Sequence, residues 1–260
     1  MDIKILVAAH KPYWMPDDDV YLPIQVGAVG KESLGWQRDD EGDNISAKNP
    51  NYCELTALYW AWKNLDADYI GLCHYRRYFA FHTLLAQMKE KKCRILKSED
   101  YERILKEYDV ILPLKGIITL GATPKTVYQQ YEKEHHIQDL DETGKILKQL
   151  YPEYESDFFY IMDQNSIYFY NMFVMRQELF QQYCQWLFSI LFELEKRSDI
   201  SKYDSYQARV FGFLSERLFN VWIVHQHLKI CEVPVTMIQD PAPKPKWYKQ
   251  LLYKISNSLN

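Results

Sequence analysis

The run from Tyr69 to Phe79 constrains the fold of this chain more than any other part of its sequence. It starts with an apolar stretch that predicts a buried strand, and it then changes abruptly to His74, Tyr75, Arg76 and Arg77. Two adjacent guanidinium groups do not suit the interior of a sheet. They suit a pocket beyond the carboxyl end of a strand, because arginine presents a planar fork of donors that matches phosphate oxygens. The alternative is that Arg76 and Arg77 form structural ion pairs.

The first 80 residues predict strands and helices in alternation. An apolar run over Ile3–Ala9 predicts a buried parallel strand. A polar loop follows, and a helix is predicted from about Tyr52 to Leu65, directly before the strand over 69–74. This order is the building block of a doubly wound sheet, so we expect an α/β fold whose mainly parallel central sheet is flanked by helices.

The remainder of the chain is more helical. Helices are predicted over 98–107, 123–135, 140–151, 177–196 and 206–228, and strands over 110–112, 167–175 and 229–235. No repeat or low-complexity linker interrupts this pattern, so residues 1–240 are expected to form one domain. Residues 241–260 differ sharply in composition and form a basic, proline-rich and aromatic tail.

Composition excludes several classes of protein. The net charge of −4 argues against a general nucleic-acid-binding role, so any cationic site must be local. The longest apolar stretch, Trp186–Leu194, is too short to span a bilayer, and the amino terminus begins with a predicted strand rather than a signal peptide. Scattered cysteines predict reduced thiols. Together these features indicate a cytoplasmic protein.

Polar and aromatic residues gather where the predicted strands end. Ligands of open α/β sheets bind beyond the carboxyl ends of the strands. That rule brings the loop after the first strand, the 37–49 loop and the 74–78 segment around one site, with Asn171 joining them as the acceptor-binding candidate. Cations, amides and aromatic faces are typical of a sugar-nucleotide site. The predicted donor-binding residues are His10, Tyr13, Asn44, Lys48, Asn49, His74, Arg76 and Arg77.

Other interpretations of these residues stay open. His10 can equally be a buried structural histidine, and the acidic residues between Asp39 and Asp43 are more often a solvated loop than a metal site. Competing chemistries lack their motifs: the chain has no G-x-S-x-G elbow, no G-x-x-x-x-G-K-[ST] phosphate loop and no G-x-G-x-x-G turn. The missing phosphate loop counts against a nucleotide-dependent phosphotransferase.

Two long blocks of sequence resemble a known bacterial family. The first is Asn-Ile-Ser-x-Lys-Asn over 44–49 with Tyr-Cys-Glu-Leu-Thr over 52–56, and the second is Tyr-Ile-Gly-Leu-x-His-Tyr-Arg-Arg-Tyr-Phe over 69–79. Segments 171–175 and 209–218 also resemble it. The family was once catalogued only as a domain of unknown function. Its members are found among capsular and exopolysaccharide glycosyltransferases, some of them described as galactosyl- or galactofuranosyltransferases.

The resemblance implies a GT-A-like hexosyltransferase that moves a sugar from a UDP-sugar donor to a lipid-linked saccharide acceptor. Such enzymes usually hold the donor diphosphate through a metal at a D-x-D motif, but His74-Tyr75-Arg76 stands at the corresponding place here. Arginines can neutralise a diphosphate directly, so we expect that no metal cofactor is required. His74 or the acidic residues of 39–43 leave recruitment of Mn²⁺ or Mg²⁺ open. The rival is a non-catalytic nucleotide-sugar-binding or carbohydrate-binding protein of a polysaccharide locus.

An inverting transfer needs a general base that deprotonates the acceptor hydroxyl. Glu216 is the first candidate, because it lies in an apolar segment with Arg209 and Arg217 close in sequence. The alternative for Glu216 is a buried ion pair between helices. The next catalytic candidates are Asp163 and Asp139.

The composition of the tail predicts that the protein acts at a membrane surface. From Lys246 onward it has the pattern of a short amphipathic helix, in which lysines alternate with Trp247, Tyr248 and leucines. Polybasic segments gain about 1 kcal/mol per Lys or Arg at an anionic leaflet, and Trp and Tyr favour the interface. We expect peripheral contact with the inner face of the cell membrane. The alternative is a tail that packs on its own domain.

Overall fold

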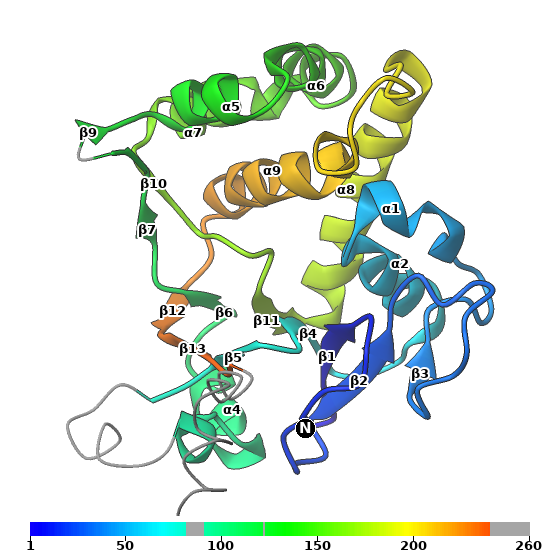
Figure 1. The fold of residues 1–260 in the computed structure, drawn as a ribbon. Coiled ribbons are helices and arrows are strands. Elements are labelled where there is room, and N and C mark those ends of the chain that lie inside the picture. Colours follow the sequence, from blue (N-terminus) through cyan, green and yellow to red (C-terminus); the bar gives the residue numbers. More distant parts are fainter. Residues whose placement is uncertain (82–90, 122, 240–260) are drawn as a thin grey trace, which may run out of the picture.

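A mixed β-sheet forms the centre of the molecule (Figure 1). The computed structural model describes residues 1–81, 91–121 and 123–239. Within them the sheet has nine strands: a path in the order β12-β6-β11-β4-β1-β2-β3, with β5 and β13 extending it beyond β4. The strands are β1 (Ile3–Ala9), β2 (Tyr21–Gln25), β3 (Gln37–Arg38), β4 (Tyr69–His74), β5 (Arg77–Phe79), β6 (Val110–Pro113), β11 (Phe173–Arg176), β12 (Ile230–Val233) and β13 (Val235–Met237).

Most neighbours along the main path of this sheet run parallel. β1 pairs in parallel with β2 and β4, β2 with β3, and β12 with β6, whereas β11 is antiparallel to both β4 and β6. Gly71 of β4 lies where β11 approaches closely, and a Cβ there would sit 2.8 Å from the carbonyl oxygen of Phe173. The predicted α/β fold with a mainly parallel sheet is confirmed. The two strands predicted over 3–9 and 69–74 are neighbours in it.

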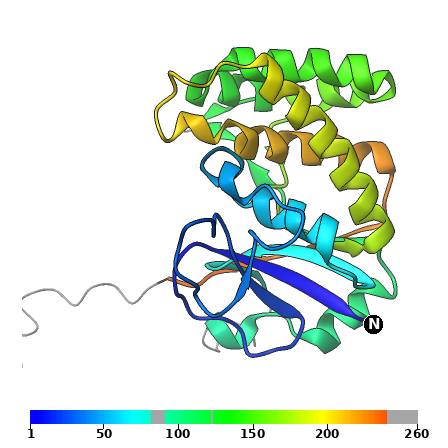
Figure 2. The same cartoon turned by 90° about the vertical axis from the view of Figure 1, so that its right-hand side faces the viewer.

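Helices cover both faces of the sheet (Figures 1 and 2). On one face α4 packs against β6, and on the other α2 packs against β1 while α8 packs against β4 and β11. Helix α9 packs on α8, and α5, α6 and α7 form an outer layer above them. The helices are α1 (Asn49–Tyr52), α2 (Leu55–Asn64), α4 (Ser98–Leu105), α5 (Val127–Glu134), α6 (Ile137–Leu150), α7 (Glu155–Asp163), α8 (Gln177–Arg197) and α9 (Val210–Gln226).

The hydrophobic core is divided by the sheet into two clusters. Along β1, Leu6 and Ala8 point into the cluster beneath α2, α8 and α9, whereas Ile5 and Val7 point into the cluster beneath α4. This alternation follows from the period of two along a strand. A strand buried on both faces explains why 3–9 is a continuous apolar run rather than an alternating one.

An ion pair and a hydrogen bond hold the segment before α2 against the carboxyl-terminal half of the chain. Lys48 Nζ forms an ion pair with Glu195 of α8 at 2.6 Å. Asn51 Nδ2 donates to the carbonyl oxygen of Ala208, at 2.8 Å, in the short 3₁₀ turn Gln207–Arg209 that precedes α9. These contacts bring the two halves of the chain together beyond the carboxyl ends of β1 and β4.

Several observed elements differ from those predicted. The single helix predicted over 52–65 is interrupted because Cys53 has a positive φ of 52°. The strand predicted over 167–175 is split into β10 (Ser166–Ile167) and β11, because Tyr170 and Asn171 both have positive φ. Helix α7 was not predicted, although its buried Phe158, Ile161 and Met162 have helical spacing.

The remaining short strands are β7 (Gly116–Ile117), β8 (Thr119–Leu120) and β9 (Thr123–Pro124). Cys53, Cys73, Cys184 and Cys231 are free thiols. Among the described residues, no helix is both long enough and apolar enough to cross a bilayer. The tail over 241–260 lies outside the described residues, so its amphipathic helix and the domain boundary at 240 stay predictions.

Candidate active site

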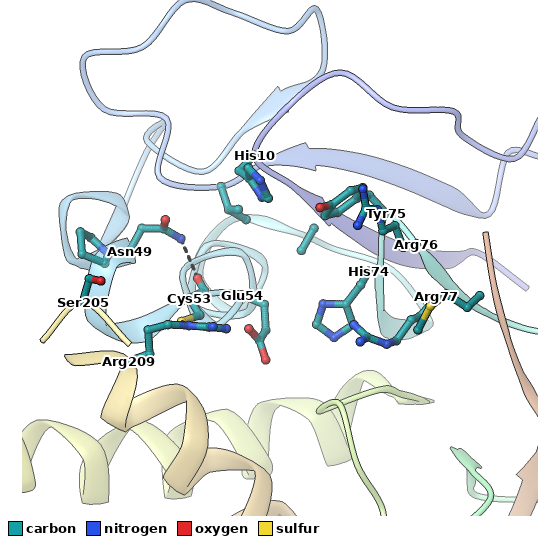
Figure 3. A pocket seen from close by; sticks show the side chains of 14 residues that line it. His10, Asn49, Cys53, Glu54, His74, Tyr75, Arg76, Arg77, Ser205 and Arg209 are labelled. Carbon is teal, nitrogen blue, oxygen red and sulfur yellow. Dashed lines mark hydrogen bonds between the residues drawn. The ribbon is translucent and has the colours of Figure 1, made fainter. Parts of the chain in front are cut away.

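A cavity of about 570 Å³ opens beyond the carboxyl ends of β1 and β4. Five of the predicted donor-binding residues line it, and Figure 3 shows them from close by. They come from the loop after β1, from α1, and from the end of β4 with the start of β5, so three segments distant in sequence meet here. The five are His10, Asn49, His74, Arg76 and Arg77.

A second cavity of about 410 Å³ adjoins the first. Cys53, Glu54, His74, Arg77 and Arg209 line both, so the two form one continuous cleft with two lobes. The first cavity is called the donor lobe and the second the acceptor lobe below. The predicted residues Asn171 and Glu216 line the acceptor lobe.

Cationic side chains gather around the donor lobe. The guanidinium group of Arg76 lies over the ring of Tyr75, at 5.3 Å from its centroid, and that of Arg77 lies over the ring of Tyr170 at 4.5 Å. Arg77 Nε is buried and has no hydrogen-bond partner among the described residues. Partial burial, with Lys11, Lys31 and Arg76 nearby, lowers the pKa of His10. The donor lobe is therefore suited to an anion.

Asn49 positions the wall of the donor lobe. Its Nδ2 donates to the carbonyl oxygen of Cys53 at 2.8 Å, the bond dashed in Figure 3, and to Thr56 Oγ1 at 3.2 Å. Gly27 allows this arrangement, because its φ is +58° and a Cβ there would lie 2.5 Å from Asn49 Oδ1. Arg209 Nε donates to Cys53 Sγ at 3.1 Å. The sharp bend at Cys53 is thus held by Asn49 and Arg209.

The turn formed by Tyr170 and Asn171 organises the junction of the two lobes. Both residues have positive φ, at 78° and 53°, which is uncommon outside glycine and costs of order 1–3 kcal/mol each. His74 Nε2 lies 2.6 Å from the carbonyl oxygen of Tyr170, so this nitrogen donates. The Tyr170 N–H donates to Glu216 Oε1 at 2.6 Å, and Asn171 Nδ2 donates to Glu54 Oε1 at 2.9 Å. The turn therefore links His74, Glu54 and Glu216.

Two carboxylates of the cleft, Glu54 and Glu216, differ in their surroundings. Both oxygens of Glu216 are engaged, one by Tyr170 and the other by Arg217 Nη1 at 2.9 Å. Burial raises the pKa of Glu216, and Arg217 opposes that shift. Glu54 precedes α2 at its N-cap position and borders both lobes.

Some predicted site residues lie away from the cleft lining. Asn44 closes a local turn, accepting from the Ser46 N–H and donating to the Gly42 carbonyl oxygen. Lys48 is paired with Glu195. Tyr13 stands behind the lining, with its ring 5.0 Å from that of Tyr75, and donates to the Ile238 carbonyl oxygen.

The two aspartates predicted as catalytic alternatives also lie outside the cleft lining. Asp139 is buried on α6 and accepts from Tyr203 Oη at 3.0 Å, and burial raises its pKa. Asp163 is exposed at the end of α7. Of the three candidate bases, the structure brings only Glu216 to the cleft.

The acidic 39–43 loop is not wholly solvated, so that interpretation is wrong for Asp39. Asp39 is fully buried and accepts from the N–H groups of Gly27 and Ala28 and from the hydroxyls of Ser46 and Thr56. Among the described residues, no three His, Cys, Asp or Glu side chains come together as metal ligands. Metal-independent action stays a prediction.

Sequence reasoning missed three residues at the junction: Cys53, Glu54 and Arg209. Cys53 and Glu54 lie inside a block that carried the family resemblance, which was the available signal. Arg209 was noted as a neighbour of Glu216 and as the first residue of the 209–218 segment that resembles the family. Its contact with Cys53 spans 156 residues, and no local pattern indicates such a pairing.

Fold and site together define a class of protein. An open, mostly parallel sheet with helices on both faces and a polar cleft beyond the ends of β1 and β4 is a GT-A-like α/β fold. The chain belongs to the family described as Domain of unknown function (DUF4422), whose profile matches residues 4–227.

A solved structure described as the apo form of the WbbM bifunctional glycosyltransferase is similar to this chain. The TM-score is 0.84 and the sequence identity 34%, over 95% of this chain and 48% of that chain. This chain therefore spans about half the length of that protein. No curated protein matches the chain.

Proposed function

We propose that this protein is a glycosyltransferase that moves a hexose from a UDP-sugar to a saccharide acceptor. The observation that carries the proposal is the two-lobed cleft, with cations around one lobe and the carboxylate of Glu54 at its junction with the other. The similarity to a bifunctional glycosyltransferase supports the same reaction class. Galactose or galactofuranose as the sugar, and capsule or exopolysaccharide synthesis as the setting, follow from the family resemblance and are part of the proposal.

In the proposed reaction the donor lobe binds the diphosphate. Arg76 and Arg77 enter this lobe beside His10 and Arg209, and guanidinium groups form charge-assisted bonds with phosphate oxygens. Negative charge grows on the diphosphate as the glycosidic bond breaks, so fixed cations stabilise the transition state more than the ground state. This is the electrostatic role that a D-x-D-bound metal has in other GT-A enzymes. Activity that persists in EDTA and is unchanged by Mn²⁺ or Mg²⁺ would support it.

In the same reaction the acceptor lobe binds the receiving saccharide. Its wall carries a stack of rings in which His135 lies 4.1 Å from Phe213 and 6.0 Å from Tyr206, measured between centroids. Tyr206 is 51% exposed, so its ring is available to pack on a sugar. Asn171 contributes an amide to the lobe. The proposed acceptor is a lipid-linked saccharide.

Nucleotide binding tests the donor lobe. Arg76→Ala and Arg77→Ala should each weaken UDP binding by about 1.5–3 kcal/mol, the range for hydrogen bonds to charged groups, which corresponds to roughly 10- to 150-fold in Kd. The two need not be equal. Arg176→Ala is the matched control, because Arg176 is exposed, pairs with Asp109 and does not line the cleft. Calorimetric titration of UDP measures the effect, and unchanged affinity in both variants would exclude the diphosphate role.

Turnover separates the enzyme from the non-catalytic alternative. Thermal shift against a panel of nucleotides and UDP-hexoses selects the donor, and release of UDP in the presence of alkyl hexosides measures transfer. A protein that is stabilised by UDP-sugars but never releases UDP would be a binding protein.

We also propose that the tail brings the protein to the inner face of the cell membrane, where lipid-linked acceptors reside. The lysines and aromatic residues of 244–254 support this. Sedimentation with anionic liposomes tests it. A chain ending at Asp240 should lose liposome binding but keep activity on a soluble acceptor analogue, and equal sedimentation of both chains would refute the role.

A further inference from the structure

We propose that Glu54 is the general base that deprotonates the acceptor hydroxyl, and that Glu216 positions the Tyr170–Asn171 turn instead of reacting. The proposal rests on the proposed glycosyltransferase function and deepens it. It reverses the sequence-based preference for Glu216. It depends on where each carboxylate lies in the cleft and on how many of its oxygens are already engaged.

Glu54 stands where the two substrates would meet. It borders both the donor lobe and the acceptor lobe, whereas Glu216 borders only the acceptor lobe. In Figure 3 the carboxylate of Glu54 projects into the cavity between Arg209 and His74. A base must reach both the acceptor hydroxyl and the side of the sugar that faces the acceptor, and the shared wall of the two lobes is the place that meets both demands.

The hydrogen bonds of Glu54 leave it able to accept a proton. Asn171 Nδ2 donates to Oε1, and no hydrogen bond of the described residues reaches Oε2. The orientation of the Asn171 amide is fixed, because Nδ2 also donates to Ser215 Oγ at 3.0 Å and that hydroxyl donates to the Gly212 carbonyl oxygen at 2.9 Å. Glu54 is therefore held in one orientation with a free oxygen.

Glu216 has the opposite character. The Tyr170 N–H and the Arg217 guanidinium occupy both of its oxygens, and its side chain is only 17% exposed. Arg217 is itself nearly buried, and its Nη2 donates to Gln130 Oε1 at 2.6 Å. A carboxylate fixed in such a network supports the strained turn that carries Asn171, and through Asn171 it fixes Glu54.

The proposed step is balanced in protons and electrons. Glu54 Oε2 takes the proton of the acceptor hydroxyl while the acceptor oxygen forms a bond to the anomeric carbon. The bond between that carbon and the β-phosphate oxygen breaks, and its electron pair leaves with UDP. Arg76 and Arg77 stabilise the negative charge on the leaving group. The proton then passes from Glu54 to water, which restores the carboxylate.

Several charged or titratable groups act on Glu54 from the surrounding elements. They belong to the bend after α1, to β4, β5, α8 and α9, and to the 3₁₀ turn before α9, so a pH profile reports on more than one group. Substitution at Glu54 isolates its own contribution. The groups are Cys53, His74, Arg77, Tyr183, Arg209 and Glu216.

The experiment compares Glu54→Gln, Glu54→Asp and Glu216→Gln in the full chain. Release of UDP is measured from UDP-galactose, UDP-galactofuranose and UDP-glucose, with octyl hexosides or water as acceptor. Glu54→Gln should lower kcat about 10²- to 10⁴-fold, the usual contribution of a general base, with UDP affinity and urea midpoint close to those of the wild type. It should also remove the acidic limb of the pH profile. Glu54→Asp should recover at least tenfold over Glu54→Gln, because it restores a carboxylate.

Glu216→Gln is the matched comparison. Its side-chain oxygen still accepts from the Tyr170 N–H, so kcat should fall less than tenfold while the acidic limb is kept. A Glu54→Gln variant with more than a tenth of wild-type kcat would overturn the assignment. So would a loss of 100-fold or more in Glu216→Gln with normal UDP affinity and stability. A wild type that releases no UDP in any combination would instead overturn the proposed function, and the assignment with it.

Discussion

Asp39 and Glu54 are two carboxylates that lie on either side of the α1 segment in the sequence, and their surroundings in the fold differ. Asp39 is fully buried and accepts from Gly27, Ala28, Ser46 and Thr56. Glu54 lies two residues before Thr56 and borders the cleft, and within the described part of the chain it accepts at one oxygen only. The number of engaged oxygens distinguishes a structural carboxylate from one that can bind a ligand. A buried charge persists only when its oxygens are satisfied, whereas an oxygen left unsatisfied beside a cavity is available to a ligand.

The largest expected effect tests the structural side of this comparison. Asp39→Asn should lower the free energy of unfolding by about 3 kcal/mol, because an amide NH₂ would face donors where a carboxylate now accepts and buried bonds to a charged group are worth about 1.5–3 kcal/mol each. Urea denaturation measures the loss. Asp40→Asn is the control, since it removes only the partly exposed pair with Arg38, worth about 0–1 kcal/mol. Equal losses in both variants would remove the distinction.

A second substitution tests the close approach of Asn49 to Gly27, beside the N–H groups that Asp39 accepts from. Gly27→Ala should cost about 2 kcal/mol, since a left-handed φ costs about 1–2 kcal/mol outside glycine and the new methyl would also displace Asn49. Gly30→Ala carries the φ cost alone, because nothing lies within 4 Å of its Cβ position. The comparison is made by thermal unfolding together with UDP titration. If Gly27→Ala and Gly30→Ala had the same thermal stability and the same UDP affinity, the close approach of Asn49 would contribute to neither quantity.

A third substitution tests whether the exposed ring of Tyr206, in the acceptor lobe, contacts the acceptor. Tyr206→Ala should raise KM for an alkyl hexoside about 2- to 13-fold, which corresponds to the 0.5–1.5 kcal/mol typical of a ring contact, and should leave UDP affinity unchanged. Tyr160→Ala removes a comparably exposed ring from α7, away from the cleft, and should change neither quantity. Steady-state kinetics at saturating donor measures the KM for the alkyl hexoside. An unchanged KM in Tyr206→Ala would mean that the acceptor binds elsewhere.

The smallest expected effect is a dependence of stability on pH at Glu216. Burial raises the pKa of this carboxyl in the folded state, so folding favours its protonated form. Its contribution to the free energy of unfolding is fully present below its ordinary pKa of about 4.3 and is lost as the pH rises toward the raised value. Relative to Glu216→Gln, the wild type should therefore lose stability over this window. Urea midpoints measured across it would contradict the shift if the difference stayed constant.

The sequence predicted the parts of the site that depend on local pattern. β1 and β4 were predicted at their observed ends because continuous apolar runs bounded by polar residues leave little freedom. Arg76 and Arg77 reach the cleft because they directly follow β4. Asn44 and Lys48 do not line it, since a short turn occupies the first and Glu195 pairs with the second.

The rest of the site could not be predicted because it depends on distant pairings. Glu54 looks like an ordinary acidic residue at the start of a helix. Its significance comes from Asn171, which lies 117 residues away, and from two consecutive positive φ angles that no residue type in that segment requires. The burial of Asp39 likewise depends on hydroxyl and amide donors supplied by the loops around it.

The fastening of the α1 segment to the carboxyl-terminal half has a consequence for how this protein folds. Lys48 meets Glu195 across 147 residues and Asn51 meets Ala208 across 157, so the cleft closes only after most of the chain has found its place. Contacts of such sequence separation form late and slowly, because the entropy of closing the loop is lost before the contact stabilises it. During refolding, affinity for UDP should therefore return after the secondary structure. A ribosome-bound chain that ends before α9 also lacks β12 and β13, so it should bind no UDP.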